Sequence, residues 1–145
     1  MAALQTNRKA NKRRKTAPIY REIEILLAWE ADVFNRLPKS KGFQLLGEEA
    51  FRSTRESLVL TEIAYKTRDI EVKKEMIGSL GVHILIITSS FRSLRELSKH
   101  TAGPKVLTEK QYLHFIDMID NISHQQRAWE ESYSQRSEAP QGVPA

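Results

Sequence analysis

Apolar residues recur at spacings of three and four along four segments of the chain, which is the periodicity of one face of an α-helix. The first segment begins at Pro18, whose missing amide hydrogen is tolerated in the first turn of a helix, and ends before Pro38. The pattern predicts a helix with a buried stripe made of Ile19, Ile23, Leu26, Val33 and Leu37.

The second segment begins near Gly42 and reaches about Thr67. Its expected buried face contains Phe43, Leu46, Ala50, Leu58, Thr61 and Tyr65. Asp69 follows, and its carboxylate is suited to accept hydrogen bonds from the free backbone amides of a helix start. We therefore expect Asp69 to cap the third helix.

The third segment has a continuous apolar stripe and ends at residues 100–104, where Gly103 and Pro104 are typical of a helix C-terminus. The expected buried stripe is Ile77, Leu80, Ile84, Ile87, Phe91 and Leu94. The β-branched residues between Val82 and Ile87 would also suit a strand, but no other segment provides a partner strand. A helix is therefore favoured.

The fourth segment begins with a capping box, in which Thr108 and Gln111 each satisfy a backbone amide of the other. Its expected buried face is Tyr112, Phe115, Ile119, Ile122 and Trp129. Four helices with short connections predict an all-α fold, an up-down-up-down four-helix bundle over residues 18–134. Residues 1–17 and 135–145 are poor in large apolar side chains and are expected to form a disordered basic N-terminal arm and a disordered polar tail.

A second apolar face is expected on the third helix. At about 100° per residue, Val82, Leu85 and Ile86 point away from the main buried stripe. Either a central helix with two neighbours needs a broad apolar face, or these three residues form an oligomer interface. Gly78 and Gly81 would permit another helix to approach closely.

The positive charge of the chain is concentrated at its start. Residues 1–17 contain six of the 23 Lys and Arg residues and no acid: Arg8, Lys9, Lys12, Arg13, Arg14 and Lys15. The other 17 basic residues are balanced by 18 acidic ones, so the body of the chain is nearly neutral despite a net charge of +5. Such a run suits electrostatic capture of nucleic acid, and it is also typical of nuclear-import signals and solubilising tails.

One sector of the third helix is expected to be basic without interspersed acids. It contains Lys74, Arg92, Arg95 and Lys99. We interpret these side chains as phosphate contacts of RNA or DNA, the alternative being an ordinary solvated face. Arg55 on the second helix would extend this nucleic-acid-binding set.

The residues needed for common enzyme chemistry are missing. The chain has no cysteine, no Gly-rich phosphate loop, no Gly-x-Ser-x-Gly elbow and no His-Glu-x-x-His pair. None of its histidines follows a glutamate by three positions, which a di-iron bundle requires: His83, His100, His114 and His124. We therefore expect a protein that is not an enzyme, with no catalytic residues, no cofactor and no metal.

The apolar stretch from Leu80 to Ile87 is too short to cross a bilayer, and the basic start lacks the apolar segment of a secretory signal. A cytoplasmic protein without a membrane segment is expected. One enzyme alternative comes from Arg95 and His100, which fit the Arg-x4-His pattern of HEPN ribonucleases. In such a site the Arg would stabilise phosphate charge while the His transfers a proton.

The order of the caps and core positions in the chain also resembles a known family. The matching segments are Pro18-Ile19-Tyr20, Leu45-Leu46-Gly47-Glu48, Leu107-Thr108-Glu109-Lys110-Gln111-Tyr112, and Gln126 with Trp129. Over residues 18–133 the chain resembles the accessory variability determinant proteins of diversity-generating retroelements. It resembles more distantly the four-helix-bundle proteins encoded within ribosomal RNA intervening sequences, whose role is the alternative expectation.

The first resemblance implies a bundle that assembles into a homo-oligomer, a pentameric barrel. It implies binding to the reverse transcriptase of the retroelement, and contact with RNA or DNA through basic outer surfaces during mutagenic copying of a template. It supplies no catalytic residue, and the matched positions are expected to be structural.

Overall fold

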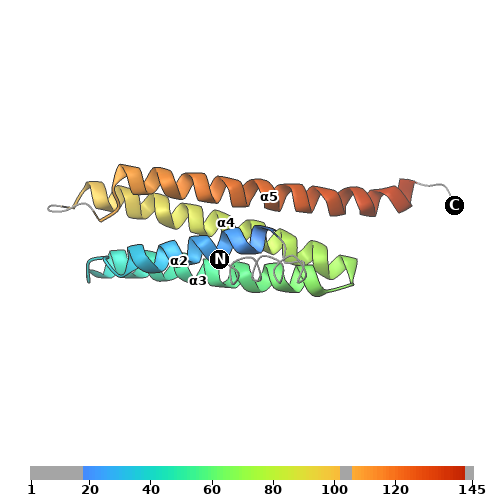
Figure 1. The fold of residues 1–145 in the computed structure, drawn as a ribbon, viewed down its shortest axis with the longest axis horizontal. Helices are drawn as coiled ribbons and strands as arrows, with labels where there is room; N and C mark the ends of the chain where they lie inside the picture. The colour runs from blue at the N-terminus through green and yellow to red at the C-terminus, as the bar shows by residue number, and fades with distance from the viewer. Residues whose placement is uncertain (1–17, 102–105, 143–145) are drawn as a thin grey trace, which may run out of the picture.

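The computed structural model describes residues 18–101 and 106–142, and in these residues it contains four α-helices and no strand. The helices are α2 (Pro18–Phe34), α3 (Lys41–Lys66), α4 (Ile70–Lys99) and α5 (Glu109–Gly142). Consecutive helices run in opposite directions, and the four surround one apolar core (Figure 1). The predicted up-down-up-down four-helix bundle is confirmed.

The predicted helix starts are also confirmed. The Asp69 carboxylate accepts hydrogen bonds from the amides of Glu71 and Val72 at 3.0 and 3.3 Å. At the start of α5, the Gln111 amide donates to the Thr108 hydroxyl at 3.1 Å, and the Gln111 side chain accepts from the Thr108 amide at 2.9 Å. Both caps use only local contacts, so their sequences suffice to specify them.

The predicted stripes form the core, with one exception. Every predicted residue of α4 is buried, as are Phe115, Ile119 and Ile122 of α5, and Trp129 is half-buried. Tyr65 was expected in the core and is instead 39% exposed. The prediction is wrong there because the buried face of α3 needs a neighbour along its whole length, and α2 does not reach Tyr65.

Small residues bring α3 close to α4, the pair with the most extensive contact. Thr54, Ser57 and Thr61 are buried on α3, and each hydroxyl donates to the backbone carbonyl four residues earlier at 2.7–2.9 Å. These polar groups therefore enter the core with their hydrogen bonds satisfied. Only Thr61 among them was expected to be buried.

Gly81 has the close helix contact that the sequence predicts. A Cβ at Gly81 would lie 2.9 Å from the Gln126 side-chain nitrogen, which donates to the Ile77 carbonyl at 2.9 Å. At Gly78 the nearest atom, in Glu130, is at an ordinary 3.7 Å. Gly81 therefore makes room for a buried Gln126 that ties α5 to the backbone of α4.

The last helix extends beyond the expected end of the bundle. The backbone of α5 is helical through Gly142, although residues 135–145 were expected to form a disordered tail. Gln, Arg, Glu and Ala in this segment are good helix formers, and adding residues to an existing helix avoids the cost of nucleation. The expected boundary at 134 is therefore wrong for the backbone.

An acidic side chain lies in the centre of the core. Glu30 is fully buried and occupies the helical position between Leu26 and Val33, a position at which the sequence analysis expected no core residue. Its Oε2 is 2.7 Å from the Thr54 hydroxyl, while Oε1 has no hydrogen-bond partner in the described part of the chain. Burial raises the pKa of Glu30 well above its ordinary value, and the Thr54 contact opposes this only partly.

We predict that Glu30→Gln raises stability at neutral pH. Below about pH 4 both the folded and unfolded states hold the proton, whereas above it the unfolded chain releases the proton first. The free energy of unfolding therefore falls as pH rises towards the raised folded-state pKa of Glu30, by about 1.4 kcal/mol for each unit of the shift. Urea unfolding across this pH range measures the effect.

The exposed Glu24 on the same helix provides the matched control, because Glu24→Gln should leave the pH profile unchanged. If Glu30→Gln and the wild type have the same pH profile, Glu30 is not protonated in the fold.

Candidate nucleic-acid interface and subunit interface

The structure describes five of the predicted nucleic-acid-binding residues. Arg55, Arg92 and Lys99 are exposed, whereas Lys74 and Arg95 are half-buried. The six cations of residues 1–17, Arg8 to Lys15, lie outside the described residues. The four α4 residues are also not equivalent, because two of them already have partners within the protein.

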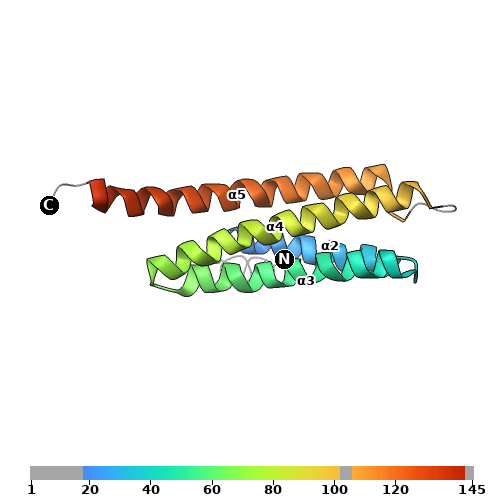
Figure 2. The same ribbon diagram turned by 180° about the vertical axis from the view of Figure 1, so that it is seen from behind.

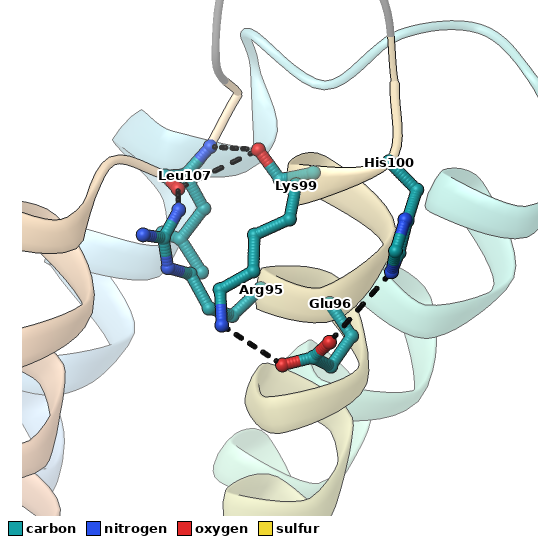
Figure 3. Close-up of polar contacts among 6 residues, drawn as sticks. Arg95, Glu96, Lys99, His100 and Leu107 are labelled. Carbon is teal, nitrogen blue, oxygen red and sulfur yellow. Dashed lines mark hydrogen bonds and ion pairs between the residues drawn. The ribbon is translucent and has the colours of Figure 1, made fainter.

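Arg95 ties the connection after α4 to the helix (Figure 3). Its Nη1 donates to the Leu107 carbonyl at 2.9 Å. On the same side of α4, the Ser98 hydroxyl accepts from the amides of Val106 and Leu107 at 3.1 and 3.2 Å. Two side chains of α4 therefore hold the backbone that leads into α5, and Arg95 stabilises this connection.

Lys99 has an acidic neighbour that the helical projection did not place beside it. Its Nζ lies 3.0 Å from Glu96 Oε1, because residues three apart on a helix can reach each other. The hydrogen bond from Lys99 lowers the pKa of Glu96. Both side chains are about half exposed, so the pair contributes little to stability but competes with a phosphate for Lys99.

Arg95 and His100 do not converge on a common site. Figure 3 shows Arg95 directed towards Leu107 and His100 directed towards the other side of α4. His100 Nε2 lies 3.9 Å from Glu96 Oε2. An Arg–His pair acting on one phosphate needs both groups at the same bond, and this arrangement does not provide it.

Arg55 borders an open apolar hollow of about 480 Å³ between α2 and α3. Phe34, Leu37 and Phe51 form its apolar wall, and Arg52 also lines it. Neither arginine makes an ion pair within the described residues, which leaves both guanidinium groups available to an anion. Arg52 was not predicted from sequence, although its position beside Phe51 and three residues before Arg55 was an available signal.

An apolar face remains uncovered on the outside of α3 and α4. Leu85 is 69% and Val82 is 56% exposed, and Ile86 is half-buried. Val59 and Ile63 of α3 are exposed as well, and α3 and α4 pack side by side. We call Val59, Ile63, Val82, Leu85 and Ile86 the outer apolar face.

The contact between the two helices places this face on one side of the bundle. His83 Nε2 of α4 lies 3.2 Å from Glu56 Oε2 of α3. Val82 and Ile86 flank His83, and Val59 follows Glu56 by three residues. The exposed apolar side chains of the two antiparallel helices are therefore neighbours.

In the described part of the chain, α4 is the helix whose length and composition would allow it to cross a membrane, with a mean hydropathy of 1.3 over its most apolar window. Many of its apolar residues instead form the core of the bundle. No group of three His, Cys, Asp or Glu residues suited to a metal ion occurs among the residues described.

We predict that Arg95 and Arg92 have different roles. Arg95→Gln should lower the free energy of unfolding by about 1 kcal/mol, because it removes a charged donor from the Leu107 carbonyl. Arg92→Gln provides the matched control on the same helix, and it should change stability by less than about 0.5 kcal/mol. Urea unfolding of both variants compares them, and equal stabilities would show that the Arg95 contact contributes nothing.

Comparison with known proteins gives no match: no family model, no curated protein and no solved structure is similar to the chain. A function is therefore assigned from the features described above. These are the available arginines, the outer apolar face and the basic residues that precede α2.

Proposed function

We propose that this protein is a non-catalytic accessory protein of a diversity-generating retroelement. In this role an oligomeric four-helix bundle binds the reverse transcriptase and the template RNA or DNA during mutagenic copying. The observation that supports it most directly is the outer apolar face, on a protein whose excess positive charge is concentrated in one terminal segment.

The outer apolar face supports assembly of identical subunits. Val82 and Leu85 are large apolar side chains whose removal from water is worth about 25 cal/mol per Å² of surface. Contiguous exposed apolar surface on a soluble protein marks an interaction site, and most soluble oligomers are made of identical subunits. The proposed subunit number, five, rests on the family resemblance.

The available cations support binding to phosphates. Arg52, Arg55 and Arg92 are exposed and make no ion pair within the described residues, and the arm adds six positive charges. Such contacts hold a nucleic acid without reading its sequence. Arg95 has a structural role in this proposal, because its guanidinium holds the connection to α5.

The partnership with a reverse transcriptase rests on the resemblance and has a direct test. A reverse transcriptase gene beside a repeat pair in the genome, together with co-purification of the two proteins, would support it. Location inside a ribosomal RNA gene would favour the intervening-sequence alternative. Metal-independent RNA cleavage that His100→Ala abolishes would replace the proposal with a ribonuclease.

We predict that Leu85→Asp dissociates the oligomer without unfolding the subunit, because it places a charge in an apolar interface while leaving the core intact. Analytical ultracentrifugation should then show a smaller particle with unchanged helical circular dichroism. Leu113→Asp is the matched control, since Leu113 is 55% exposed on α5, outside the outer apolar face. A wild-type protein that is monomeric would contradict the proposal.

We also predict that RNA binding depends strongly on salt. Deletion of residues 1–17 together with Arg55→Gln and Arg92→Gln should weaken binding and flatten the salt dependence by about 0.7 for each lost phosphate contact on a single strand. Fluorescence anisotropy at several salt concentrations measures both quantities. Lys66→Gln is the control, because Lys66 is paired with Glu62 at 2.8 Å, and an unchanged slope in the combined variant would exclude these residues.

A further inference from the structure

The bundle lacks its fourth helix at one corner. Helix α2 has 17 residues, whereas α3, α4 and α5 have 26, 30 and 34. Figures 1 and 2 show α2 beginning part-way along α3 and α5, both of which continue past its first residue. Beyond Pro18, side chains that would face α2 in a full-length bundle are therefore left partly uncovered.

An aromatic hollow of about 420 Å³ lies at this corner. Tyr65 of α3 and Trp129 and Tyr133 of α5 line it, and Pro18 lies at its edge. Tyr65 is 39% exposed, and the other two rings are half-buried. The short α2 explains why Tyr65 follows the buried periodicity of α3 and yet remains open to solvent.

A fixed positive charge lies beside the rings. Lys73 also lines the hollow, and its Nζ donates to the Ala64 carbonyl at 2.8 Å. The same Nζ is 5.7 Å from the centre of the Tyr133 ring, which is within the range of a cation–π interaction. The hollow therefore combines exposed aromatic faces with a cation held by the backbone of α3.

The chain that precedes α2 starts at the edge of this hollow. Lys15 is three residues before Pro18, so it can lie no more than about 10 Å from the edge. Residues 1–17 contain only Met1 and Leu4 as large apolar side chains, so the segment itself is poorly suited to fill an aromatic hollow. Its six cations are suited to hold phosphates there.

We propose that the aromatic hollow binds a base of a single-stranded nucleic acid by stacking on Tyr65 and Trp129, while cations of residues 1–17 hold the adjoining phosphates. Aromatic side chains beside a positively charged track are the usual means of binding single strands without sequence preference. This inference rests on the proposed nucleic-acid binding and assigns to it a site that base-free phosphate contacts would not need.

The test uses the fluorescence of Trp129 in the full-length protein with Trp29→Phe, which leaves one tryptophan. A single-stranded oligonucleotide of about 12 nucleotides should quench the emission, and an oligonucleotide of the same length with abasic sites should bind more weakly and quench little. Tyr65→Ala should weaken binding of the base-containing strand by about tenfold. Tyr65→Phe is the matched control, since it keeps the stacking ring and should bind like the parent.

Circular dichroism and urea unfolding confirm that the variants fold. If the abasic and base-containing strands bind and quench equally, the hollow does not take a base, although the proposed nucleic-acid binding stands. If neither strand binds, the proposed function fails as well. A change in Trp129 emission on deleting residues 1–17 without nucleic acid would show that this segment occupies the hollow, and would overturn the inference.

Discussion

The close packing of α3 against α4 is the contact on which the rest of the structure depends. Gly47, Ala50, Ser53, Thr54 and Ser57 make the buried face of α3 small, and the hydroxyls of Thr54 and Ser57 return to its own backbone. Such a face allows close approach without unsatisfied polar groups. It also makes α4 the central helix, in contact with α3 and α5, so that its remaining side faces outwards.

The contact between α2 and α3 has a different character. Glu30 and Thr54 form a buried polar contact, and one carboxyl oxygen is left without a partner in the described residues. An apolar residue at position 30 would avoid this cost, so stability alone does not explain the glutamate. Polar pairs of this kind can fix the register of two helices, which here would set where α2 begins and how much of the corner beyond Pro18 stays open.

The surfaces proposed for assembly and for nucleic acid share no residue. The outer apolar face comes from α3 and α4, whereas the aromatic hollow is lined by all four helices at the end where α2 begins. A neighbouring subunit on the outer apolar face would therefore leave Tyr65 and Trp129 in place for a base. An oligomer would also present several basic segments and hollows together, which strengthens binding to one long strand without new contacts.

The sequence by itself determined the features that depend on local interactions. The helices, the Asp69 cap, the Thr108–Gln111 capping box and most of the core follow from periodicity and from contacts within a turn. The tertiary structure decided whether Tyr65 is covered and which group Arg95 contacts, because both depend on how far a distant segment extends. Periodicity shows which face of a helix turns inwards, but only the length and position of neighbouring helices decide what covers that face.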